Sequence, residues 1–138
     1  TLVNRTFEVA LSEVSTREDV SLLAYSPLGQ GYLTGKYLGG ARPAGARTTL
    51  FKRGQRYEGI NAEPAIRAYM ELAADLEVTP ATLALAWVGS RDFLASAIIG
   101  ATTLAQLEED LAAFDFEITP ESAAKIDAIH LRFPNPCP

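Results

Sequence analysis

The stretch Leu22–Tyr37, LLAYSPLGQGYLTGKY, decides which kind of fold this chain adopts. An apolar run ends at Tyr25, and the sequence then turns through a proline and the glycine pair Gly29 and Gly31. A short apolar run that is bounded by proline and glycine is typical of a strand in a parallel sheet covered by helices on both faces. We therefore expect residues 20–25 to form a strand that is buried on both faces.

Helical patterns lie on both sides of this strand. Residues 6–18 and residues 61–78 carry apolar side chains at helical spacing, so we expect each segment to form a helix with one buried face. The Thr-Pro pairs at 79–80 and 119–120 combine a helix cap with proline at the first helical position, which predicts two further helices. We expect Trp87 to lie in the core, because it is four residues from Leu83 on one side of its helix.

A second strand is expected at residues 96–100, SAIIG, followed by a helix that Thr102 or Thr103 caps. Residues 39–59 contain several glycines and five basic residues without a clean period, which indicates a long loop. This order of helices and strands predicts an α/β fold. Two strands leave both edges of a sheet unpaired, so we expect the chain to be part of a larger sheet.

Composition limits the function classes. The net charge is -5 and the basic residues are scattered, which disfavours nucleic acid and anionic membranes as partners. We see no leader pattern and no apolar run near the roughly 20 residues of a membrane span. Cys137 is the single cysteine, so we expect no internal disulfide, a reducing cytoplasmic location and no metal site. We expect Cys137 at the surface and His130 in a structural or surface role.

Both predicted strands end in residues that suit a ligand. Glycine lets the main chain approach a bulky group, and polar or charged side chains follow each strand. These residues are Ser26, Gly29, Gln30, Gly31 and Lys36 after the first strand, and Gly100 and Thr102 after the second. Ligands bind at the carboxyl ends of parallel strands, and helix N-termini favour anions, so a phosphate-bearing ligand is the economical interpretation. An ordinary tight connection at either junction is the alternative.

The segments YSPLGQGYLTGKY and IIGATTLAQLEED, with NRTFEV, GARPAGART and FKRGQRY beside them, resemble the aldo-keto reductases and their bacterial Tas-like subgroup. The resemblance covers nearly the whole chain. It implies a (β/α)8 TIM barrel, in which residues 1–138 would be the C-terminal part of a single barrel domain. That part holds strands 7 and 8 with their helices and the long cofactor loop, and the N-terminal part of the barrel would lie outside the chain.

The resemblance also implies NADP(H) as the cofactor and a role for each matched position. Tyr25 would stack on the nicotinamide ring, and Arg47 would fold over the cofactor from the loop. Gln106 would lie near the adenosine 2'-phosphate. Asp110 stands where the family usually has asparagine, and an ionised aspartate can only accept hydrogen bonds. The full cofactor-binding set implied by the resemblance is Tyr25, Ser26, Pro27, Leu28, Gly29, Gln30, Gly31, Lys36, Arg47, Gly100, Thr102, Gln106, Glu109 and Asp110.

The function implied by this resemblance is NADPH-dependent reduction of aldehydes or ketones, with a small carbonyl compound as substrate. The family's catalytic aspartate, tyrosine, lysine and histidine lie earlier in the barrel, so we expect no catalytic residue in this chain and no activity from the chain alone. One alternative is a nucleotide-binding regulatory or channel-associated subunit of the same fold. Another is an inactive folded fragment. In each case we expect the missing barrel part or a second copy to cover the open sheet edges.

Overall fold

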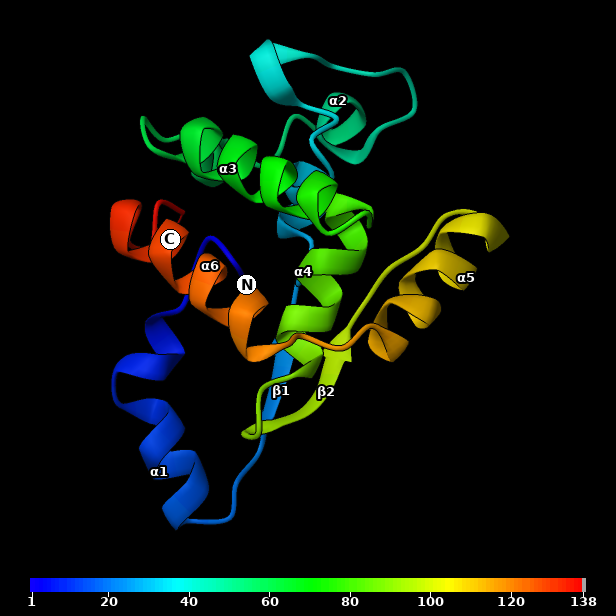
Figure 1. Cartoon of the computed structure of the whole chain (residues 1–138). Helices are drawn as coiled ribbons and strands as arrows, with labels where there is room; N and C mark the ends of the chain where they lie inside the picture. Colours follow the sequence, from blue (N-terminus) through cyan, green and yellow to red (C-terminus); the bar gives the residue numbers. More distant parts are fainter. Residues whose placement is uncertain (138) are drawn as a thin grey trace.

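The computed structural model describes residues 1–137, which fold into a parallel two-stranded sheet with helices packed against it (Figure 1). The strands are β1 (Leu22–Tyr25) and β2 (Leu94–Ile98). The helices are α1 (Leu11–Arg17), α2 (Arg47–Phe51), α3 (Ala62–Asp75), α4 (Pro80–Gly89), α5 (Leu104–Ala112) and α6 (Pro120–Arg132). Short 3-10 turns occupy Thr6–Val9, Gly29–Thr34, Leu38–Gly40, Gln55–Tyr57 and Ala113–Asp115. The predicted α/β class is confirmed.

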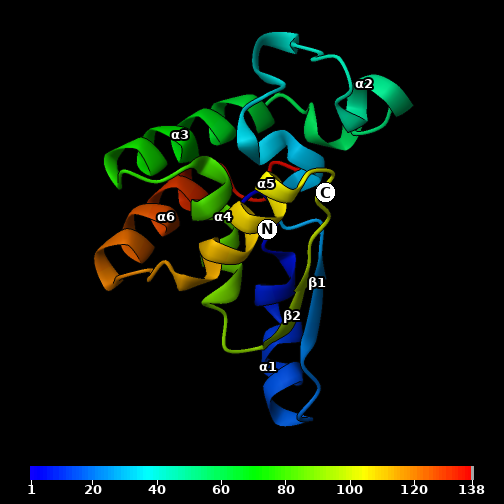
Figure 2. The same cartoon turned by 90° about the vertical axis from the view of Figure 1, so that its right-hand side faces the viewer.

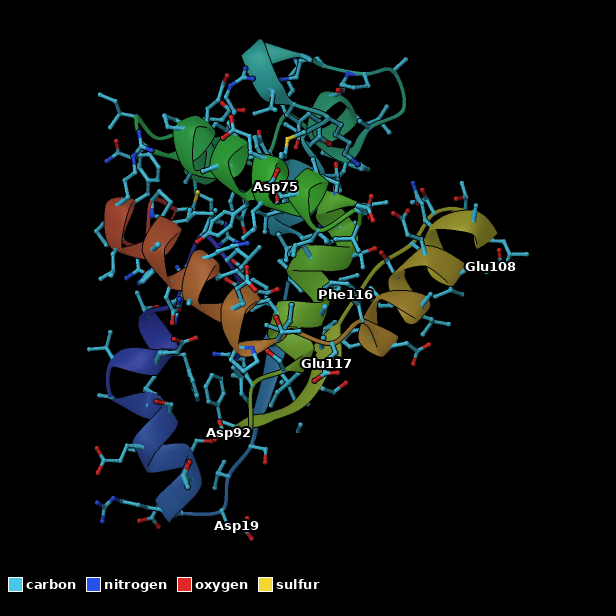
Figure 3. All side chains as sticks on the ribbon, in the orientation of Figure 1. Asp19, Asp75, Asp92, Glu108, Phe116 and Glu117 are labelled. Atoms are coloured by element: carbon cyan, nitrogen blue, oxygen red, sulfur yellow. The ribbon has the colours of Figure 1, made fainter. Side chains whose placement is uncertain are left out.

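The sheet brings the two strand ends together. β1 and β2 are parallel, and Tyr25 at the end of β1 is registered with Ile98 at the end of β2. Asp19 and Asp92, which precede the two strands, lie at the opposite end of the sheet (Figure 3). Because the pairing is parallel, the segments that follow the two strands leave from the same edge, as the sequence predicts.

The core forms where α4 meets α3 and α6. Leu83 and Trp87 of α4 are 0% and 3% exposed, and they belong to one apolar cluster with Tyr69 of α3 and Ile126 of α6. Thr79 caps α4 by accepting a 3.0 Å hydrogen bond from the backbone N–H three residues on. The predictions of a buried α4 and a core Trp87 are confirmed.

One face of the sheet lies open. The helices α3, α4 and α6 lie on one side of the strands in Figure 2, and no element of residues 1–137 covers the opposite side. Leu23 and Tyr25 are 60% and 63% exposed, and Ile98 is 53% exposed. The prediction that the first strand is buried on both faces is therefore wrong for this structure, because its alternate side chains point to a face without a packing partner.

The first predicted helix and the second predicted strand also differ from expectation. A break at Ala10 (φ -148°) separates a 3-10 turn from α1, so residues 6–18 do not form one helix. The apolar stripe is largely unburied, with Val9 81% exposed and Val14 52% exposed. β2 begins two residues earlier than predicted and ends before Gly100. Of the two predicted caps of the following helix, Thr103 is the one that caps α5.

Cys137 lies in the core, so its predicted surface position is wrong. Its side chain is 0% exposed, and its backbone N–H donates a 3.1 Å hydrogen bond to the carbonyl of Val3. This bond pins the C-terminal tail beneath the first residues of the chain. Burial raises the pKa of the thiol to about 11, which makes a reactive thiolate unfavourable at neutral pH. His130 is half-buried, in line with the predicted structural or surface role.

Candidate functional site

The turn after β1 is built from left-handed backbone conformations. Gly29 and Gly31 have φ of 56° and 93°, and Ser26 and Gln30 adopt φ of 53° and 56° although they are not glycine. The turn is closed by hydrogen bonds from the N–H of Gly29 to the carbonyl of Ser26 (2.8 Å) and from Gly31 to Leu28 (2.9 Å). Non-glycine residues in this region are uncommon and concentrate where function requires them.

Lys36 lies directly over this turn. A Cβ added at Gly31 would stand 2.7 Å from Lys36 Cε and 2.9 Å from Lys36 Nζ, so the end of the lysine would have to shift to make room for it. The ammonium group also lies 5.4 Å from the centre of the Tyr37 ring. The turn thus places one positive charge above backbone that a ligand can approach closely, which suits a phosphate group.

Gln30 carries an open hydrogen-bonding group at the same turn. Its Oε1 atom is buried and has no hydrogen-bond partner within residues 1–137. Buried acceptors are normally paired, so a donor from a bound molecule, such as a ribose hydroxyl, fits this atom. Pro27 is buried and Leu28 is half-buried beside it, which gives the turn an apolar wall.

Arg56 joins the long loop to the end of β1. Its guanidinium donates to the hydroxyls of Tyr25 (3.2 Å) and Tyr57 (2.9 Å) and lies over both rings. The hydrogen bond to Tyr25 is the main cause that raises the pKa of Arg56 above its ordinary value. Sequence reasoning missed this residue; its place in FKRGQRY, between basic and aromatic neighbours, was the available signal. Tyr25 still exposes most of its ring, as a stacking residue requires.

The turn after β2 has its own closed hydrogen-bond pattern. Thr102 donates to Gln106 Oε1 through its backbone N–H (3.0 Å) and its hydroxyl (2.9 Å), and the N–H of Gln106 donates to Thr103 Oγ1 (3.2 Å). The carbonyl oxygen of Gln106 is thus occupied, while its amide NH₂ can still donate to an anion. Gly100 is exposed, with open space where a side chain would stand. Thr102 and Gln106 therefore lie together, as predicted.

Glu109 and Asp110 differ in their surroundings. Glu109 Oε1 accepts a 2.7 Å hydrogen bond from the Thr79 hydroxyl, which ties α5 to the start of α4. Asp110 is 4% exposed, and burial, followed by the neighbouring Glu109 charge, raises the pKa of its carboxyl. Glu108 lies on the outer side of α5 (Figure 3). A nearly buried carboxyl with a raised pKa is easier to protonate, and a protonated Asp110 could donate a hydrogen bond as asparagine does.

Arg47 is a predicted site residue whose side chain has no polar contact with the rest of the site. It begins α2 and is exposed, and its side chain makes no hydrogen bond or ion pair within residues 1–137. Figure 1 shows α2 in the loop beyond the end of β1.

The described residues contain no cluster of histidine, cysteine and carboxylate groups suited to a metal ion. In the same part of the chain, no helix is long and apolar enough to cross a membrane.

The fold and the two glycine-bearing strand ends define an α/β protein with a candidate site for a phosphate-bearing ligand. The model of the Aldo/keto reductase family matches residues 1–131, and the chain belongs to this family. The comparison thereby confirms the resemblance that the motifs carry.

Three relatives illustrate the similarity. The protein tas of Escherichia coli is 48% identical over 137 residues, covering 99% of this chain and 40% of that protein, which matches the Tas-like subgroup. A putative voltage-gated potassium channel subunit beta of Schizosaccharomyces pombe is 37% identical over 112 residues, covering 76% and 32%. An uncharacterized oxidoreductase of Mycobacterium tuberculosis is 39% identical over 106 residues, covering 76% and 32%. The chain thus spans about two fifths of the length of tas.

Proposed function

We propose that the chain provides the cofactor-binding part of an NADPH-dependent oxidoreductase that reduces aldehydes or ketones. The observation that carries this proposal is the register of Tyr25 with Ile98 in a parallel pair. This register brings two segments to the same end of the sheet: the glycine turn under Lys36, and the turn at Thr102 that precedes α5. Family membership and the oxidoreductase among the relatives support the coarser statement that the protein is an oxidoreductase.

The residues at this edge fit the parts of a nicotinamide dinucleotide phosphate. The exposed ring of Tyr25 offers a flat apolar surface for stacking, and Lys36 offers the charge that a pyrophosphate needs. The amide NH₂ of Gln106, whose carbonyl oxygen is held by Thr102, suits the 2'-phosphate, which distinguishes NADPH from NADH. When bound, the cofactor supplies a hydride, while this chain contributes binding and orientation.

The remaining parts of the proposal concern the whole protein. We place residues 1–138 in the C-terminal part of a barrel domain, with strands 7 and 8 corresponding to β1 and β2. The residues that protonate the carbonyl oxygen and shape the substrate pocket would lie outside the chain, so the chain alone should not turn over substrate. A cytoplasmic location suits a protein whose one cysteine is a buried thiol rather than half of a disulfide.

A second candidate function is a nucleotide-binding subunit of a channel. The similarity to a protein described as a potassium channel subunit beta favours it, at 37% identity. A subunit with that function would bind the nucleotide but would not need to turn over a substrate. The match of the Aldo/keto reductase family model to residues 1–131, together with the relative named as an oxidoreductase at 39% identity, makes the oxidoreductase the better-supported choice. An inactive fragment paired with another copy through its open strand edges is the third candidate.

The choice between an oxidoreductase and a channel subunit is tested by the consumption of NADPH in the presence of a small aldehyde, followed by absorbance. We expect turnover from the protein with a complete barrel and none from residues 1–138 alone. NADPH binding by the complete protein without turnover of any aldehyde or ketone would favour the channel-subunit function. Turnover by residues 1–138 alone would contradict the placement of the catalytic residues outside the chain.

A further inference from the structure

A cavity lies within the long loop that follows β1. Its volume is about 330 Å³, and its wall includes Arg42, Thr48, Thr49, Lys52, Arg53 and Glu58. None of these residues belongs to the cofactor-binding set above, and Arg47, the loop residue of that set, does not line the cavity. An inference about the cavity therefore rests on residues other than those of the cofactor-binding set.

The cavity wall has an excess of positive charge. Arg42 is paired with Glu58 at 2.7 Å, and Glu58 also accepts a hydrogen bond from the Tyr32 hydroxyl, so the one acidic side chain named in the wall is already engaged. Lys52 and Arg53 are exposed and form no ion pair with a carboxylate of residues 1–137. Two unpaired cations beside a cavity attract an anion, even though the whole chain is acidic.

One hydroxyl group of the wall lacks a partner. The Oγ1 atom of Thr49 is buried with no hydrogen-bond partner within residues 1–137, whereas Thr48 is 5% exposed and its hydroxyl lies beside the Tyr32 hydroxyl. A buried hydroxyl without a partner costs free energy, so each unpaired one needs an explanation. Lys52 holds a left-handed φ of 48°, which is a common way for a helix to end, here at the end of α2.

We propose that this cavity binds a phosphate monoester of a small molecule. Lys52 and Arg53 match the two negative charges of the dianion, and the Thr49 hydroxyl can donate to one of its terminal oxygens. A volume of about 330 Å³ is at the lower end of the range for ligand pockets and leaves room for a small organic group beyond the phosphate. The loop then carries a phosphate site of its own beside the cofactor site.

Calorimetric titration of the purified protein with inorganic phosphate and with phenyl phosphate, at an ionic strength of about 0.15 M, tests this site. We expect phenyl phosphate to bind more tightly, because its ring fills space that phosphate leaves empty. Lys52→Gln and Arg53→Gln should each weaken binding about tenfold, since each removes a charge-assisted contact. Thr49→Val removes a hydroxyl at nearly constant volume and should also weaken binding. The matched control is Arg132→Gln, which removes the same charge from an exposed site at the end of α6, outside the cavity, and should leave the affinity unchanged.

Several results would overturn the proposal. One is the absence of binding of either ligand at about 10 mM. Another is an equal loss of affinity in Arg132→Gln and Lys52→Gln, which would indicate attraction by net charge rather than a built site. Equal affinity for both ligands would refute a monoester site. Displacement of phenyl phosphate by saturating NADP⁺ would assign it to the cofactor site. Circular dichroism checks that the variants fold, which is expected because Lys52 and Arg53 are exposed.

Discussion

Arg56 lies over the ring of Tyr25, with its guanidinium carbon 5.6 Å from the ring centre, and donates a 3.2 Å hydrogen bond to the Tyr25 hydroxyl. The two residues are 31 positions apart and belong to the long loop and to the end of β1. The same guanidinium holds Tyr57, which packs against Gly29 in the glycine turn. One side chain thus fastens the loop to the residue on which we propose the nicotinamide ring stacks.

Arg56→Ala should loosen the loop, because it removes both hydrogen bonds and both ring contacts. We expect faster tryptic cleavage after Arg47, Lys52 and Arg53, the exposed basic residues of the loop. Arg56→Lys keeps the charge but cannot donate to both hydroxyls from a planar group, so it should show an intermediate rate. Cleavage at the wild-type rate in Arg56→Ala would show that the contact does not restrain the loop.

Gly31→Ala should destabilise the protein and displace Lys36, because the new Cβ would collide with the lysine and the residue holds a φ of 93°. The expected loss in free energy of unfolding is about 1–3 kcal/mol, measured by urea denaturation. Gly45→Ala is the control, since Gly45 also has a positive φ of 77° but open space at the Cβ position. An equal loss in the two variants would mean that backbone strain alone, and not the contact with Lys36, requires glycine.

Asp110→Asn should make the protein more stable at neutral pH. Burial, and then the Glu109 charge, raise the pKa of Asp110 above its ordinary 3.8, so the folded protein keeps a proton that the unfolded chain has lost. The free energy of unfolding therefore falls as the pH rises from the pKa of Asp110 in the unfolded chain to its higher pKa in the folded protein. The gain in Tm from the substitution should grow from about pH 4 toward pH 7. A gain that is independent of pH would show that Asp110 does not titrate in this way.

Gln106→Glu should weaken NADPH much more than NADH. The glutamate can still accept the two hydrogen bonds from Thr102, so the start of α5 should be retained, but its charge would repel a 2'-phosphate. Fluorescence titration with both nucleotides measures the difference, and the melting temperature serves as the control for folding. An equal loss for the two nucleotides would place Gln106 away from the phosphate.

The elements that could be predicted from sequence are those that local chemistry determines. Thr79 followed by Pro80 begins α4, and Thr119 followed by Pro120 begins α6, because a hydroxyl cap and a fixed proline φ both favour the first helical turn. The glycine turn after β1 is of the same kind, since its backbone conformations disfavour most other residues. Parallel pairing followed from the alternation of helices and strands.

Other features depend on partners that are distant in sequence. The exposure of Leu23 is decided by what packs on the sheet, which the pattern of the strand does not contain. Cys137 is buried because the tail binds Val3, and a residue's own neighbours do not reveal such docking. The contact of Arg56 with Tyr25 depends on the path of the loop, and residues 39–59 have no period from which that path could be read.

The central claim is that the two strand ends form one nucleotide site, and titration of the protein with NADPH, followed by the fluorescence of the bound cofactor, tests it most directly. We predict saturable binding of one NADPH, weakened about tenfold or more by Lys36→Met at the first junction and by Gln106→Glu at the second, since each change removes or opposes a charge-assisted contact. Absence of saturable binding, or binding that neither substitution weakens, would contradict the claim.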